Sequence, residues 1–220
     1  GHNYKEKSRA LTKATTSKDG KRTATYTCTR TGCKATYTKT LQTYYKVNTI
    51  KLNKTAYTYN GKVQKPSVTV KDSKGKTLKK GTDYTVSYSS GCKNVGRYTV
   101  KVTLKGNYSG TKSLSYNINP KGTSVSKLTA AKKGFKVTWK KQASQTSGYE
   151  VQYSTSSNFK KGNKTVNITK NKTTSKSVSK LSAKKKYYVR VRTYKTVKVN
   201  GKNVKLYSGW SKAKSVTTKK

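Results

Sequence analysis

The chain has 220 residues, in which 52 Lys and Arg stand against 5 Asp and Glu, so its formal net charge is +47. This length allows two domains, each with its own core. No apolar run is long enough to span a membrane, so we expect no membrane insertion. The mean hydropathy of −0.97 is typical of disordered chains. Apolar residues nevertheless alternate with polar ones in run after run, and 18 tyrosines supply half-buried surface. The sequence therefore predicts an all-β protein.

Residues 1–46 show little sustained alternation and contain His2, Cys28 and Cys33. The motifs Gly-His-x-Tyr and Thr-Tyr-Thr-Cys in this segment resemble a short repeat of secreted Firmicutes proteins. The pattern of that repeat has a His, one Cys and a later Cys-x-x-Cys-Gly. This copy differs, because Thr16 stands where the first Cys is expected and Cys28 and Cys33 are separated by four residues. We expect a short Cys- and His-containing β-hairpin module closed by a Cys28–Cys33 disulfide. Free thiols are one alternative. A metal site that includes His2 is another, although a closed zinc site needs four ligands.

Residues 47–119 consist of short alternating stretches separated by turn sequences. Alternation is clear at Ile50 and Leu52 and again over residues 98–104, and Asn60-Gly61 is a turn dipeptide. Short strands at such spacing are typical of a β-sandwich. Three motifs resemble a bacterial immunoglobulin-like repeat: Tyr-Thr-Tyr-Asn-Gly-Lys, Lys-Pro-Ser-Val-Thr-Val-Lys-Asp and Gly-Thr-Asp-Tyr-Thr-Val-Ser-Tyr. The resemblance implies an immunoglobulin-like sandwich over the whole segment.

Residues 120–220 follow a short Pro-Lys-Gly joint and show the strongest alternation of the chain. In the run Tyr-Tyr-Val-Arg-Val-Arg of residues 187–192, one strand face is apolar and the other is charged. Leu181 precedes Tyr187 by six residues, the spacing of a tyrosine corner, in which the phenol packs inside and its hydroxyl bonds to upstream backbone. With this spacing, a Trp on an early strand and the motif Tyr-x-Val-x-Tyr, the segment resembles a fibronectin type III domain. The following residues are expected in its core: Trp139, Tyr149, Phe159, Leu181, Tyr187, Val189 and Val191.

Catalytic motifs are missing from the sequence. The five acids are isolated, so no pair of carboxylates is available for general acid and base chemistry. Cys92 lacks a base, because the only His lies in another segment. No Gly-rich phosphate loop precedes a helix. We therefore expect no enzyme activity, no cofactor and no bound metal.

Charge is the feature that calls for a partner. Outward lysines keep sheet edges from pairing, and this explains many of them. A net charge of +47, however, exceeds by far the magnitude of roughly 2 to 8 that solubility requires of a small domain. We expect an anionic polysaccharide or cell-wall polymer as partner, or a host surface glycan or receptor. Specific nucleic-acid binding is not expected, because the lysines are spread over both modules. The candidate polyanion-binding residues are Lys101, Lys136, Lys140, Arg190 and Arg192.

The resemblances together imply a setting for the chain. They imply a noncatalytic adhesion or spacer region of a secreted or cell-surface Gram-positive protein. The outward lysines favour a monomer. The alternative is a set of accessory C-terminal modules of a secreted hydrolase whose catalytic domain lies upstream.

Overall fold

The computed structural model describes residues 1–220 and contains seventeen β-strands and no helix. The predicted all-β class is confirmed. None of its elements is a helix that could cross a membrane. The chain divides into two compact units, the first made of residues 1–55, 65–90 and 99–116, and the second of residues 56–64, 91–98 and 117–220. The domain boundaries predicted after residues 46 and 119 stay predictions, because strands of the middle segment contribute to both units.

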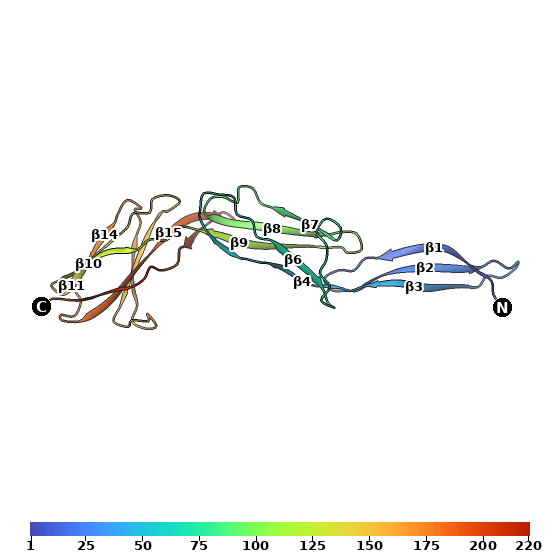
Figure 1. Cartoon of the computed structure of the whole chain (residues 1–220), viewed down its shortest axis with the longest axis horizontal. Coiled ribbons are helices and arrows are strands. Elements are labelled where there is room, and N and C mark those ends of the chain that lie inside the picture. The colour runs from blue at the N-terminus through green and yellow to red at the C-terminus, as the bar shows by residue number, and fades with distance from the viewer. The chain divides into compact units, whose positions relative to one another are not determined.

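The N-terminal part of the first unit is a three-stranded antiparallel sheet (Figure 1). Its strands are β1 (Tyr4–Thr12), β2 (Gly20–Cys28) and β3 (Thr36–Tyr44), with β2 in the centre. The expected hairpin therefore has a third strand. β1 is exposed along its whole length, and β3 is exposed at every residue except Tyr44. Most of this sheet thus has no apolar layer against it.

The middle segment supplies the core of the first unit. β4 (Val47–Leu52) pairs with β6 (Val68–Asp72), and a second sheet has the order β5 (Ala56–Thr58), β9 (Thr111–Asn119), β8 (Gly96–Leu104) and β7 (Tyr84–Tyr88). Two residues from the N-terminal segment, Ala14 and Tyr44, are buried in this core. The buried residues of the cluster are Ala14, Tyr44, Val47, Ile50, Val70, Leu78, Tyr84, Val102, Leu104 and Tyr108.

Two sheets pack face to face in the second unit. The first has the order β10 (Val125–Ala131), β11 (Gly134–Trp139) and β14 (Ser175–Val178). The second has the order β13 (Lys164–Ile168), β12 (Gly148–Ser154), β15 (Lys186–Val199) and β16 (Lys202–Tyr207), and β17 (Lys214–Thr217) also pairs with β15. This arrangement is a β-sandwich.

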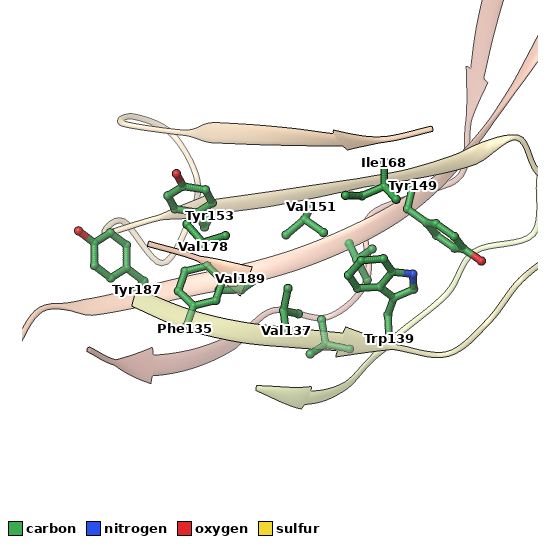
Figure 2. Packing of buried hydrophobic residues seen from close by; sticks show 12 residues of the cluster. Phe135, Val137, Trp139, Tyr149, Val151, Tyr153, Ile168, Val178, Tyr187 and Val189 are labelled. Carbon is green, nitrogen blue, oxygen red and sulfur yellow. The ribbon is translucent and has the colours of Figure 1, made fainter. Parts of the chain in front are cut away.

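The core of the sandwich follows the alternation of the sequence. Inward residues of β11 (Phe135, Val137 and Trp139) face those of β12 (Figure 2). Trp139 is 2% exposed, and its ring lies 5.3 Å from that of Tyr149. Of the residues expected in this core, Trp139, Tyr149, Tyr187, Val189 and Val191 are buried in one cluster, and Leu181 packs against it half-buried.

Two details differ from the sequence expectation. The Tyr187 ring is buried, but its hydroxyl makes no hydrogen bond to upstream backbone. Tyr149 does bond to backbone, because its hydroxyl donates to the carbonyl of Asn171 (2.8 Å) and accepts from the amide of Gln142 (2.9 Å). The hydroxyl of Tyr194 also donates to a backbone carbonyl, that of Ile168 (3.4 Å). Phe159 is buried but lies outside the core cluster, because it packs against Arg190.

Candidate functional site

Three segments that are far apart in the sequence meet at one end of the sandwich. They are the β10–β11 turn, the loop between β14 and β15, and the last residues of the chain, whose end lies beside β10 and β11 (Figure 1). The amide of Lys133 donates to the carbonyl of Lys219 (3.0 Å), and the amide of Leu181 donates to the carbonyl of Lys133 (2.8 Å). A bridge between Lys132 and Lys219 adds to this contact. The backbone of this end is therefore tied together by hydrogen bonds.

Thr218 anchors the assembly from inside. The residue is only 3% exposed. The hydroxyl donates to the carbonyl of Ser182 (2.6 Å) and accepts from the amide of Lys185 (3.0 Å). Its backbone carbonyl accepts from the amide of Lys184 (3.1 Å). One buried threonine thus fixes the loop that precedes β15.

The backbone at this end is also strained. Lys133, Lys180 and Lys184 have φ values of 43°, 60° and 51°, in the left-handed region that non-glycine residues seldom adopt. Gly134 is required beside them, since a Cβ at that position would lie 2.2 Å from the carbonyl oxygen of Val178. Such conformations persist where surrounding contacts enforce them, and they are common at binding sites.

The side chains of this end form what we call the lysine pole. All of them are exposed. The members are Lys132, Lys133, Lys180, Lys184, Lys185, Lys186, Lys219 and Lys220. Sequence reasoning missed this cluster, because its members come from three separate segments.

No side-chain carboxylate balances the pole. Glu150 is the only acid in residues 120–220, and it bonds to Arg192 at 2.7 Å. Two like charges about 10 Å apart in water repel each other by about 0.4 kcal/mol. The ammonium groups of the pole therefore repel one another, and a bound anion would reduce this repulsion.

The structure separates the lysines predicted from the sequence. Lys136 is exposed on the outer face of β11, between Thr129 and Ser177 on the neighbouring strands. Lys140 is exposed just beyond the end of the same strand, and Lys101 is exposed on β8 in the first unit. Lys136 and Lys140 thus contribute charge to the sandwich surface, and none of the three belongs to the pole.

Arg190 and Arg192 stack on aromatic side chains of the same domain. The Arg190 guanidinium lies over the rings of Phe159 (4.0 Å) and Trp210 (4.7 Å). That of Arg192 lies over Trp210 (4.2 Å) and Tyr207 (3.8 Å). Aromatic rings and guanidinium groups therefore alternate along the outer face of β15, with Trp210 between the two arginines.

Polar contacts hold the same two arginines in place. Arg192 pairs with Glu150, and Arg190 donates through Nε to the side-chain carbonyl of Gln152 (2.9 Å). Both arginines are half-buried, and burial, followed by the charge of Arg192, lowers the pKa of Arg190. The binding of polyanions by these two residues stays a prediction, and their contacts favour a structural role.

The acids have structural partners as well. Asp72 accepts from the amides of Lys74 (2.9 Å) and Lys76 (3.0 Å) in a tight turn. Asp83 accepts from the amide of Lys79 (2.8 Å), and Asp19 accepts from that of Lys46 (2.7 Å). These carboxylates order loops.

A second cluster of chemically capable side chains lies in the first unit. His2, Cys28 and Cys33 bring one ligand atom each to within 4.8 Å of one another. Both cysteines are free thiols in the structure, so the expected disulfide is not formed there and its formation under oxidising conditions stays a prediction. Hydrogen bonding by the Cys33 thiol, above all, lowers the pKa of Cys28 to about 6, and the same contact raises that of Cys33. Cys92 is buried in the other unit.

Comparison with known proteins identifies part of the chain. Residues 118–206 match the model of the fibronectin type III domain. Among solved structures, the FN1–FN3 domains of chicken CNTN1 are 13% identical, with a TM-score of 0.39 and coverage of 90% of this chain and 78% of that one. Domains A168–A170 of titin are 15% identical, with a TM-score of 0.33 and coverage of 96% and 83%. No curated protein matches the chain.

Proposed function

We propose that this chain is a noncatalytic binding and spacer region of a secreted or cell-surface protein, and that the lysine pole binds anionic polysaccharide or cell-wall polymer. Fibronectin type III domains are commonly noncatalytic modules and are typically extracellular. The observation that carries the proposal is the pole itself, in which eight exposed lysines are presented by a hydrogen-bonded, strained backbone without a side-chain carboxylate between them.

The chemistry of the pole favours a polymer over a small anion. Lysine carries a hydrated point charge on a flexible stem and makes no planar fork of the kind with which arginine selects carboxylate or phosphate geometry. Many such charges recognise the density of negative groups along a chain. A polymer with regularly repeated sulfate, carboxylate or phosphate groups can contact several lysines at once and release its condensed counterions.

Lysines outside the pole support the binding at long range. Lys136 and Lys140 are exposed on the same sandwich and raise the positive potential around it. Such a field accelerates the encounter with a polyanion, and added salt screens it. Residues outside the pole should therefore affect the rate of association more than the rate of dissociation.

The test compares two variants of the full chain that lose equal charge. One replaces three pole lysines (Lys184→Gln, Lys185→Gln and Lys186→Gln). The control replaces three exposed lysines at the end of the sandwich opposite the pole: Lys170, which follows β13, Lys198, near the end of β15, and Lys202, the first residue of β16. Binding to heparin, to a glycerol-phosphate teichoic acid and to neutral dextran is measured between about 50 and 500 mM salt, a range over which counterion release changes affinity steeply.

We expect both anionic polymers to bind at low salt and to dissociate as salt rises, and dextran not to bind. The pole variant should lose affinity and reduce the salt slope by about one for each lysine that contacts the polymer. The control should keep the salt slope and the rate of dissociation, and should lose only the little affinity that a slower association accounts for. Equal losses in the two variants would show that binding is diffuse and would refute the assignment to the pole. Salt-insensitive binding of dextran would reveal a neutral-sugar site instead.

A further inference from the structure

The far end of the N-terminal sheet has no buried apolar core. The rings of Tyr4, Tyr37 and Tyr26 pack on one another there, but those of Tyr4 and Tyr37 are exposed. At the near end, Ala14 and Tyr44 are buried in the core of the first unit. Toward the other end, every residue of β1 is exposed, and β2 contributes Ala24 and Cys28 as its buried apolar residues. A three-stranded sheet needs an apolar face or another constraint for stability. Something other than a core should therefore hold the far end.

Three metal-binding side chains meet at this far end. Cys28 closes β2 opposite Tyr4, the first residue of β1, so His2 lies beside it. The Nδ1 atom of His2 is 3.3 Å from the Sγ atom of Cys33. All three ligand atoms lie within 4.8 Å of one another, the separation expected around one ion.

Backbone hydrogen bonds hold the three residues in position. The amide of Thr29 donates to the carbonyl of Asn3 (2.8 Å), which ties the residue after His2 to the residue after Cys28. The amide of Cys28 donates to the carbonyl of Ala35 (2.9 Å), and that of Cys33 donates to the carbonyl of Arg30 (3.0 Å). The turn that carries both thiols is therefore ordered before any ion binds.

We propose that His2, Cys28 and Cys33 bind a zinc ion that fastens the far end of the sheet. Two thiolates and one imidazole are a donor set that zinc prefers, and four residues between the cysteines lie within the usual spacing of zinc-binding pairs. Binding replaces the thiol protons by the metal and releases them to solvent, with no change of oxidation state.

The cluster supplies three protein ligands and leaves the fourth position of the ion open. Thr16 cannot supply the fourth, because it follows β1 at the end opposite Cys28, where Thr12 pairs with Lys21. Water or a donor from another molecule takes the fourth position. This inference is independent of the function proposed for the lysine pole, since it concerns the other unit.

The test uses the full chain, reduced and stripped of metal, with the amine of Gly1 acetylated so that it cannot act as a ligand. Zn²⁺ is titrated in competition with a coloured chelator, and Co²⁺ serves as the spectroscopic probe. We expect one ion per chain, a thiolate-to-cobalt charge-transfer band and the visible bands of tetrahedral cobalt. Hydrogen exchange of amides in β1 and in the turn after β2 should slow when zinc is added.

Single substitutions distinguish a specific zinc site from nonspecific zinc binding by the chain. His2→Gln should weaken zinc binding by about tenfold or more without unfolding the chain, because His2 is exposed. Cys28→Ser and Cys33→Ser should abolish the charge-transfer band or halve it, whereas the control Cys92→Ser should leave it unchanged.

Three outcomes would overturn the inference. The first is a reduced chain that binds no zinc. The second is a His2→Gln variant that binds zinc as tightly as the parent. The third is a Cys28–Cys33 disulfide that re-forms in the presence of zinc in a glutathione buffer, with oxidised glutathione as the oxidant, which would make the pair a covalent crosslink and not a metal site.

Discussion

Replacing Thr218 by valine should separate the shape of the lysine pole from its charge. The substitution keeps the branched shape of the side chain and every lysine. It removes the hydroxyl of a buried residue, which bonds to Ser182 and Lys185. A buried polar group left without its partner costs about 1 to 3 kcal/mol. The amide of Lys185 and the carbonyl of Ser182 both lose this partner. Because both residues are exposed, water replaces part of the lost bonding, so we expect unfolding of the second unit to become easier by about 1 to 2 kcal/mol.

Polymer binding should weaken in the same variant although its net charge is unchanged. The loop that carries Lys184, Lys185 and Lys186 would have to be ordered on binding. Ordering flexible side chains costs about 0.5 to 1.5 kcal/mol each, so a loss of about 1 kcal/mol, or roughly fivefold in affinity, is expected. Denaturant unfolding and heparin titration at fixed low salt measure the two effects.

The control is Thr218→Ser, which retains the hydroxyl and should restore both stability and affinity to near the parent values. If Thr218→Val unfolds and binds like the parent, Thr218 does not hold the loop, and the reasoning that the pole is a preformed site is refuted.

Three further predictions concern the core, the charge and the thiols. Trp139→Ala should lower the free energy of unfolding, measured by thermal unfolding, by about 3 to 5 kcal/mol, because it truncates a large core side chain. Trp139→Phe should lower it much less, because the buried Nε1–H of Trp139 has no hydrogen-bond partner to lose. Equal losses in the two variants would contradict this. Salt that screens repulsion between lysines should raise the melting temperature of the parent chain more than that of the pole triple variant, and identical shifts would count against strong repulsion at the pole. The pKa of Cys28 lies at about 6, below its ordinary value, so in metal-free reduced protein its thiolate should be present at pH 7 and be lost as the pH falls through 6. The ultraviolet absorbance of the thiolate, followed against pH in the parent and in Cys28→Ser, measures this. A midpoint near the ordinary thiol value would contradict it.

The sequence predicted those strands that have one buried and one solvated face. Phe135, Val137 and Trp139 alternate because β11 lies on a core, and the periodicity is visible without a structure. The strand β1 could not be found in this way, because all its residues are exposed and no periodicity is imposed on them. The all-β class was therefore predictable, and the third strand of the N-terminal sheet was not.

The candidate sites depended on contacts that are remote in sequence. Arg190 alternates outward, as a solvated charge would, and its stacking on Trp210 depends on the chain that follows β16. The lysine pole depends on Thr218, whose bond to Ser182 joins segments that carry no common motif. His2 and the two cysteines were recognised as a set from the sequence, but only the register of Tyr4 with Cys28 places them together.

The most direct test of the proposed function maps where a sulfated polymer touches the protein. Amide chemical shifts of the isotope-labelled full chain are followed while a short heparin fragment is added at low salt. The account predicts that the largest changes fall in residues 131–134, 180–186 and 217–220 and disappear when salt is raised. Changes of equal size spread over both units, or concentrated around Arg190 and Arg192, would contradict it.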